Sequence, residues 1–303
     1  MQPTASPIPH PRTRLRIALV LCLVLAGAWV ALGQRSRQAP VAEPAEGELR
    51  SGLIRNPGPR SRAGVPEWTV DPAFRADVFT FARLQFRSRG RGGWRVDYPG
   101  ADLNLSYRLE QLTSMRTDPH GTVVAIEDPR LFDYPFVYMS DPRSITLSRE
   151  EAEILRRYLL NGGFLMVDDF WGDGMWNHIV GEFRKIFPDR DPVSLPLDHP
   201  IFNIPYPIRN KPQIPSDDSA HRTRHLPDPY RTWEDEISWE SPQPADYRAF
   251  LDDRGRIVIL LCWNTDLADG WEEEGSSEWF FTTYSEKSAY PIGINIVFHL
   301  LTH

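Results

Sequence analysis

The sequence predicts an α/β domain, a three-layer sandwich in which helices cover both faces of a largely parallel sheet. Short apolar runs of strand length alternate along the chain with helical stripes. The run at 256–263 (RIVILLCW) is almost continuously apolar, as in a strand that is covered on both faces. A helix that ends in the segment 161–163 (NGG) is followed at once by the apolar run 164–167. Glycine ends a helix readily because it adopts the left-handed conformation at little cost.

The first half of this domain is expected to contain three strands and one helix. An aromatic run at 79–86 predicts the first strand. Asp102 can cap a helix that continues to about Met115, with leucines spaced along one face. The apolar runs at 122–126 and 136–139 then predict two buried strands.

Three further helices are expected in the second half. Ser148 and Glu151 form the S-x-x-E pattern of a capping box, which starts the helix that ends at NGG. An apolar stripe predicts another helix at about 175–187, and 292–301 closes the chain as an apolar helix. Between them, residues 188–250 are rich in proline and have no regular pattern, which is typical of a lid, a docking surface or disorder.

Before this domain the chain has three parts: a short basic tail (1–16), a hydrophobic segment (17–33) and a Pro/Gly-rich linker (34–67) that leads to the α/β domain (68–303). The hydrophobic segment contains no charged residue, which indicates membrane targeting or tethering. It is slightly shorter than the roughly 20 residues of a spanning helix, and Ala31-Leu32-Gly33 resembles a signal cleavage site. A membrane anchor and a cleaved signal peptide both remain open.

Charge and cysteine content limit the classes of function. The net charge of −7 argues against a broad nucleic-acid surface. Three arginines precede the hydrophobic segment and two follow it, an excess that favours a cytoplasmic amino terminus. We therefore expect a single-pass inner-membrane protein with its domain outside the cytoplasm, or a periplasmic or secreted protein after cleavage.

The two cysteines, Cys22 and Cys262, lie in separate apolar segments, so neither a disulfide nor a cysteine-rich metal site is expected.

The blocks 94–99 (WRVDYP), Asp128-Pro129 with 134–136 (YPF), Leu155-Arg156 with 162–165 (GGFL), Asp168-Asp169, 199–202 (HPIF) and 301–303 (LTH) carry a family resemblance. Together they resemble the bacterial domain-of-unknown-function family 4159, over roughly residues 78–303. The resemblance implies a relative of the class I glutamine amidotransferase (flavodoxin-like) fold, in a family with many membrane-associated members and no assigned activity. Amidotransferases of this fold carry a cysteine nucleophile after a central strand, where this chain has Asp168-Asp169. Without a thiolate, covalent glutamine hydrolysis is not available.

The strongest candidate site lies at the end of the strand that precedes Asp168 and Asp169. In α/β sheets, ligands bind beyond the carboxyl ends of the strands. Either aspartate could bind a metal ion or act as a general acid or base, with His199 as a further catalytic candidate. Adjacent strand residues point to opposite faces, so only one of the two is expected to face the cleft. A helix cap and a structural histidine are the alternative interpretations.

Two acidic and aromatic loops follow the two strongest strands. The first contains Trp171 and Asp173, and the second contains Asp266, Asp269 and Trp271. If these loops converge, carboxylates could bind a divalent cation, with Asp266 joining Asp168 and Asp169 as a candidate metal ligand. Carboxylates with tryptophan faces would suit a carbohydrate. Asp97, before the first helix, is a further candidate for the same cleft. The alternative is two solvated turns whose tryptophans close the domain edge.

From these features we expect a membrane-tethered, extracytoplasmic and non-catalytic domain that acts as a binding or scaffold module in the bacterial envelope. Its partner would be an envelope protein or a carbohydrate, and no cofactor other than a divalent cation is expected. The alternative is a hydrolase, with or without a metal ion, that uses Asp168 or Asp169 together with His199.

Overall fold

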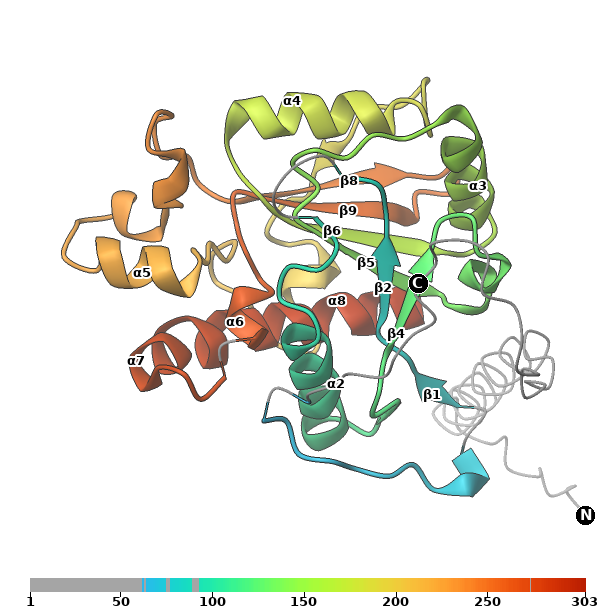
Figure 1. Ribbon diagram of the computed structural model, residues 1–303, viewed down its shortest axis with the longest axis horizontal. Coiled ribbons are helices and arrows are strands. Elements are labelled where there is room, and N and C mark those ends of the chain that lie inside the picture. The colour runs from blue at the N-terminus through green and yellow to red at the C-terminus, as the bar shows by residue number, and fades with distance from the viewer. Residues whose placement is uncertain (1–61, 63, 75–76, 89–92, 273) are drawn as a thin grey trace, which may run out of the picture. The chain divides into compact units, whose positions relative to one another are not determined.

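The computed structural model describes residues 62, 64–74, 77–88, 93–272 and 274–303, all within the compact unit Ser51–His303 (Figure 1). The hydrophobic segment 17–33, and with it the anchor and signal-peptide predictions, lies outside these residues. Among the described helices, none combines the length and the hydropathy that are needed to cross a bilayer.

A seven-stranded sheet forms the centre of the described domain, in the order β4-β2-β5-β6-β9-β8-β7. Its strands are β2 (Ala82–Gln85), β4 (Thr122–Ala125), β5 (Phe136–Ser140), β6 (Phe164–Phe170), β7 (Val193–Ser194), β8 (Asp246–Leu251) and β9 (Ile257–Trp263). The first five strands of the order are parallel, whereas β8 is antiparallel to both of its neighbours. The parallel strands lie in the chain order second, first, third, fourth, fifth, so the winding reverses between β2 and β5, where such sheets bind ligands.

Helices cover both faces of this sheet, as the sequence predicts (Figure 1). On one face lie α2 (Gly100–Leu112) and α8 (Tyr290–Thr302), and on the other lie α3 (Arg149–Leu160) and α4 (Gly172–Phe183). Every residue of β6 and β9 is buried, because these central strands receive side chains from both helical layers. The α/β sandwich with a mostly parallel sheet is therefore confirmed.

Short elements complete the fold: the two-stranded sheet of β1 (Val78–Phe79) and β3 (Arg116–Thr117), the turns η1 (Pro72–Phe74), η2 (Pro129–Asp133), η3 (Pro200–Phe202), η4 (Tyr230–Thr232) and η5 (Asp235–Ile237), and the helices α5 (Asp217–Thr223), α6 (Asp269–Glu272), α7 (Glu278–Phe280) and η6 (Phe281–Ala289). The last of these, η6, is π-helical and continues directly into α8. The proline-rich stretch 188–250 thus contains only short elements before β8 begins.

Residues at its two ends determine where α3, the helix that precedes β6, begins and ends. The Ser148 hydroxyl accepts the Glu151 backbone N–H, and the Glu151 carboxylate accepts the Ser148 N–H, which confirms the capping box. Asn161 caps the other end, and Gly162 follows with φ of +104°, a conformation that glycine adopts without a steric penalty.

Other boundaries differ from the sequence prediction. The aromatic run 79–86 divides into β1 and β2. Helix α2 starts at Gly100, and Asp102 forms a buried ion pair with Arg83 instead of capping the helix. Strand β6 extends to Phe170, so Asp168 and Asp169 lie within the strand and not after it.

Candidate functional site

Five buried aspartates gather at the carboxyl edge of the parallel strands, and we call them the acidic cluster: Asp97, Asp168, Asp169, Asp266 and Asp269. Asp97 follows β2, Asp266 follows β9, and Asp269 begins α6. One carboxylate oxygen from each of Asp97, Asp266 and Asp269 lies within 4.8 Å of the other two. Among the described residues, no other group of three histidine, cysteine, aspartate or glutamate side chains reaches this spacing.

Asp168 and Asp169 both contribute to the cluster because β6 is irregular at this point. Asp169 has a positive φ of 56°, and the pairing of β6 with β9 shifts in register between Val167 and Phe170. Such a bulge interrupts the alternation of side chains between the faces of a sheet. Both carboxylates are buried, and the charge of Asp97 raises the pKa of each. The bulge therefore gives a reason why both carboxylates can lie near Asp97, where a regular strand predicts only one.

Strained backbone surrounds the cluster. The non-glycine residues with positive φ in the described part of the chain are Asp97, Asp141, Asp169 and Asn264. Asp141, Asp169 and Asn264 lie at the carboxyl ends of β5, β6 and β9, and Asp97 lies in the connection from β2 to α2. Such conformations cost of order 1–3 kcal/mol each and are concentrated at functional sites. Their position at one edge of the sheet identifies this edge as the candidate site.

Arg83, which sequence reasoning did not select, positions the loop that carries Asp97. Its guanidinium is fully buried and pairs with Asp102, with both carboxylate oxygens 3.0 Å from Nε. It also donates hydrogen bonds to the backbone carbonyls of Trp94 and Val96, immediately before Asp97. A charged residue between Ala82 and Leu84 in an apolar strand was the available signal, because arginine is rarely buried without a partner.

Asp168 is held rigidly through one of its two oxygens. Its Oδ2 accepts hydrogen bonds from the Tyr138 hydroxyl at 3.1 Å and from the backbone N–H groups of Leu267 and Ala268 at 2.9 and 3.1 Å. Its Oδ1 is buried and has no partner among the described residues. Burial raises the pKa of Asp168 to about 7, although the hydrogen bonds from Tyr138 and from the Ala268 N–H oppose this shift.

Burial and mutual repulsion raise the pKa values of the other four aspartates well above their ordinary range. After burial, the largest contributions come from Glu272 for Asp97, Asp141 for Asp169, Asp169 for Asp266 and Asp97 for Asp269. The neighbouring cations already have partners, because Arg83 pairs with Asp102 and Arg143 pairs with Asp141. The cluster therefore combines concentrated negative potential with oxygen donors only, the donor set that hard divalent cations prefer.

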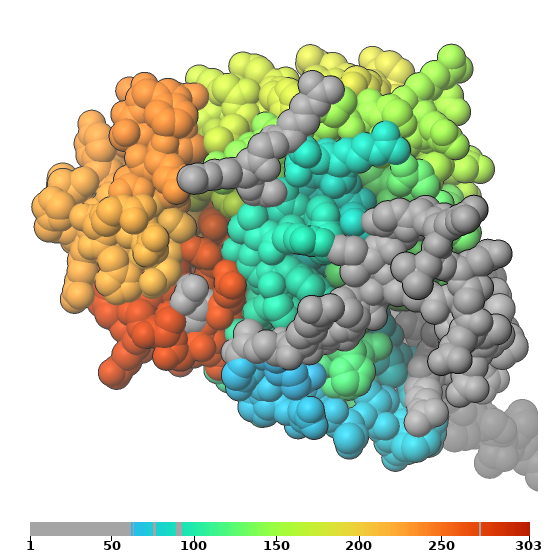
Figure 2. Space-filling view, in the orientation of Figure 1, coloured from blue at the N-terminus to red at the C-terminus, as the bar shows by residue number. Residues whose placement is uncertain are grey.

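Part of the proline-rich stretch covers this edge. The Asp266 N–H donates to the Ile214 carbonyl at 2.8 Å, and the Asp217 N–H donates to Asp269 Oδ2 at 2.7 Å. The segment that contains α5 and η5 (orange) lies against the segment of α6 and α7 (red) in Figure 2. We call residues 211–240 the cover segment. Of the three roles expected for this stretch, its placement fits a lid.

His199 lies apart from the aspartates with which it was grouped. It caps η3, where its Nδ1 accepts the Ile201 N–H at 3.3 Å, and its ring centroid is 5.1 Å from that of His299. Burial and the charge of His303 lower its pKa, and no member of the acidic cluster contributes to this shift. His299 on α8 and His303, which caps the end of this helix, are spaced as H-x-x-x-H, a pattern that sequence reasoning also missed.

The remaining candidates from the two loops, Trp171, Trp271 and Asp173, lie outside the acidic cluster, and the two tryptophans pack within the domain. Trp171 is buried against Trp233, with ring centroids 5.5 Å apart. Trp271 is buried, and its indole N–H donates to the Ala289 carbonyl at 2.9 Å. Trp171 also lines the smaller of the two cavities described below. Asp173 is exposed in the first turn of α4, outside the cluster.

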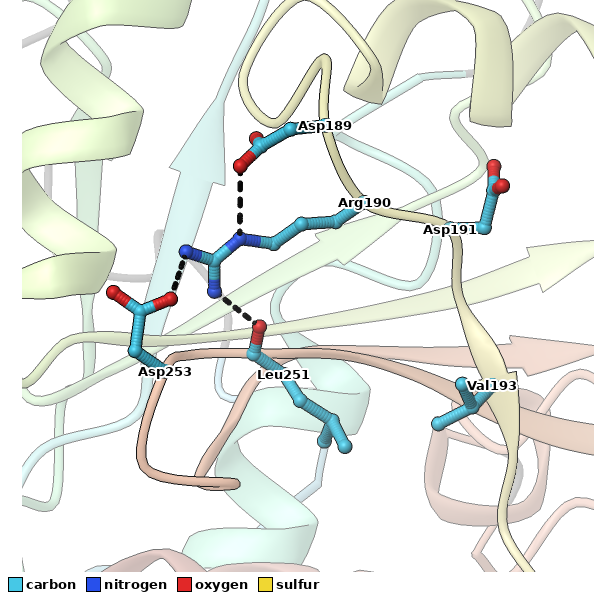
Figure 3. A pocket seen from close by; sticks show the side chains of 6 residues that line it. All are labelled: Asp189, Arg190, Asp191, Val193, Leu251 and Asp253. Carbon is cyan, nitrogen blue, oxygen red and sulfur yellow. Dashed lines mark hydrogen bonds and ion pairs between the residues drawn. The ribbon is translucent and has the colours of Figure 1, made fainter.

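Two of the cavities among the described residues bear on the site. The larger, about 360 Å³, is at the opposite edge, where Arg190 is already bonded to the Leu251 carbonyl and to Asp253 (Figure 3). The smaller, about 70 Å³, lies beside the cluster and is lined in part by Arg143, whose pKa is influenced by Asp169. Only the smaller cavity is close to the candidate site.

Comparison with known proteins identifies one family. A family model described as Domain of unknown function (DUF4159) matches residues 80–301, which are 222 of the 303 residues of the chain. This match confirms the family resemblance that the sequence blocks predict. No curated protein matched the chain.

Proposed function

Because the chain belongs to the Domain of unknown function (DUF4159) family, whose description assigns no activity, we propose a function from the site itself: the α/β domain binds a divalent cation at the acidic cluster. The observation that carries this proposal is the approach of Asp97, Asp266 and Asp269 to within 4.8 Å, all buried. Oxygen ligands of this kind suit Ca²⁺ or Mg²⁺.

Electrostatics supports the proposal. Two ionised carboxylates 4.8 Å apart repel each other by about 3 kcal/mol at an effective dielectric constant of about 20. The three aspartates form three such pairs, so the empty site either holds protons or destabilises the fold. A divalent cation removes the repulsion and replaces the lost hydration with ligand bonds. Cation binding therefore competes with protons and strengthens as the pH rises.

A bound cation would join separate parts of the domain. Asp97 comes from the loop after β2, whereas Asp266 and Asp269 come from the loop after β9. Asp269 also accepts a hydrogen bond from the cover segment at Asp217. We infer that the cation stabilises the closed cover and thereby a binding surface of the domain. This role suits a non-catalytic module.

We also propose that the domain lies outside the cytoplasm and that its fold is related to that of amidotransferase-like proteins. Segment 17–33 would hold the domain outside the cytoplasm, where it would bind an envelope protein or a carbohydrate. The strand order supports kinship with amidotransferase-like proteins. Thiol catalysis is not part of the proposal, because Cys262 is fully buried and burial raises the pKa of its thiol well above the ordinary value.

The test is a Ca²⁺ and Mg²⁺ titration by calorimetry, with the full-length chain in mild detergent after treatment with a chelator. We expect the wild type to bind and Asp269→Asn to lose at least tenfold in affinity. Asp253→Asn is the matched control, because Asp253 is 87% exposed and lies at the opposite edge. A wild type that binds neither cation, or equal losses in both variants, would refute the proposal.

A second candidate is a metal-assisted hydrolase that uses Asp168 or Asp169. The pKa of Asp168, about 7, suits a general acid or base at neutral pH, and strained backbone at Asp169 is typical of active sites. This candidate proceeds without His199, which packs beside His299. A panel of ester, amide and phosphoester substrates should then yield an activity that Asp169→Asn removes while the melting temperature is unchanged. No turnover of any substrate in the presence of Ca²⁺, Mg²⁺ or Mn²⁺ would exclude it.

A further inference from the structure

We propose that the acidic cluster holds two divalent cations and not one. This inference rests on the proposed cation-binding function and extends it, because it assigns ligands to a second ion. The first ion is bound by Asp97, Asp266 and Asp269. The second is assigned to Asp168 and Asp169, which lie side by side on the irregular part of β6.

Charge balance is the first argument. The five carboxylates of the cluster carry a charge of −5 when ionised, so one divalent cation leaves −3 and two leave −1. The described arginines nearest to the cluster do not supply the difference, because Arg83 is paired with Asp102 and Arg143 with Asp141. A net charge of −3 in a buried site is unfavourable, since low-dielectric surroundings strengthen repulsion. A second divalent cation offsets most of it.

Unused ligand atoms are the second argument. Asp168 is 0% exposed, and its Oδ1 has no hydrogen-bond partner among the described residues. Its Oδ2 is bonded to the N–H groups of Leu267 and Ala268, so the carboxylate faces the loop that carries the first set of ligands. A buried carboxylate oxygen without a donor is rare in a folded protein and calls for a ligand. This atom is the independent sign that a group is bound here.

Asp169 supplies the second ligand. The residue is 7% exposed, and the largest charge that acts on its buried carboxylate is that of Asp141. Its backbone is held at φ of +56°, which turns the side chain away from the regular strand direction. Backbone strain and a buried carboxylate that is repelled by its neighbours occur at one residue, as expected where a ligand compensates for both.

Asp266 connects the two groups. The charges that act on it include Asp269 from the first set and Asp168 and Asp169 from the second. Both sets are therefore close enough to Asp266 for their charges to act on it, so ions held by the two sets would be neighbours. The cluster therefore offers carboxylates to two neighbouring ions.

The experiment uses Mn²⁺ as the probe, with the full-length chain in detergent and free of metal. Equilibrium dialysis counts the ions, and electron paramagnetic resonance reports whether neighbouring Mn²⁺ spins interact. We expect two Mn²⁺ per chain and a spin-coupled spectrum. One Mn²⁺ per chain with an uncoupled spectrum would overturn the two-ion inference and leave the proposed function intact. No bound Mn²⁺ would overturn both.

Variants test the assignment of the second site. Asp169→Asn should retain one Mn²⁺ and lose the coupled signal, whereas the exposed control Asp253→Asn should retain two coupled ions. Two coupled ions in Asp169→Asn would overturn the role given to this residue. If Asp169→Asn does not fold, the ion count and the spectrum of the wild type still decide the proposal.

Discussion

Replacing Asp168 with asparagine is expected to stabilise the metal-free protein and to reduce the stabilisation that a divalent cation provides. Asparagine keeps the shape and the oxygen that accepts from Tyr138, Leu267 and Ala268, but it carries no charge. It also replaces the unpartnered Oδ1 with an amide group that cannot bind a cation. The substitution therefore separates the cost of burying the charge from the benefit of binding the ion.

The magnitude follows from the pKa of Asp168, about 7 in the folded protein and 3.8 as its ordinary value. A raised carboxyl pKa stabilises the fold below pH 3.8, and this contribution is lost as the pH rises through about 7. At 1.36 kcal/mol per pKa unit, the loss at pH 8 is about 4 kcal/mol. The metal-free variant escapes this loss, so it should be more stable than the wild type by up to about 4 kcal/mol. At pH 5 the difference should shrink to about 2 kcal/mol.

Adding a cation should remove the difference in stability between the wild type and the Asp168→Asn variant. A ligand at 1,000 times its dissociation constant stabilises a protein by about 4 kcal/mol, which is similar to the cost of the buried charge. The variant lacks the anionic ligand and gains less. Urea unfolding is followed by tryptophan fluorescence, once with chelator and once with saturating Ca²⁺. The first measurement gives the cost of the buried charge, and the second gives the stabilisation by the cation. Asp253→Asn serves as the control. A metal-free variant no more stable than the wild type at pH 8, or a gap that Ca²⁺ leaves unchanged, would refute the reasoning.

Three further predictions concern the rest of the domain. Arg83→Ala should lower the free energy of unfolding by about 3–5 kcal/mol, because it leaves Asp102 buried and unpaired; the double variant with Asp102→Ala should recover part of the loss in urea unfolding. Ser148→Ala should cost about 1 kcal/mol through loss of the capping box, with an unchanged urea m-value, and a changed m-value would contradict a purely local effect. Burial and His303 lower the pKa of His299 from 6.5 to about 4, so stability should fall as the pH decreases through this range; an identical pH profile of His299→Gln between pH 6.5 and 4 would show that another group is responsible.

Local chemistry made much of the fold predictable from the sequence. The capping box at Ser148 and the glycines after Asn161 act within a few residues, so their effect can be read without tertiary information. The apolar run 256–263 indicated a covered strand for the same reason, and β9 is buried along its whole length. The boundaries that failed, at β6 and α2, depended on partners that are distant in sequence, such as Arg83 for Asp102.

The sequence by itself determined the family, the alternating α/β architecture, and the presence of aspartates after the strongest strands. Only the tertiary structure decided which aspartates meet. Asp97 joins Asp266 and Asp269 because the strand order brings the ends of β2, β6 and β9 to one edge, although more than 160 residues separate them in the chain. The bulge that turns Asp169 inward is likewise set by pairing with β9. Contacts between distant segments fix such geometry, and a periodic pattern within a single segment carries no information about them.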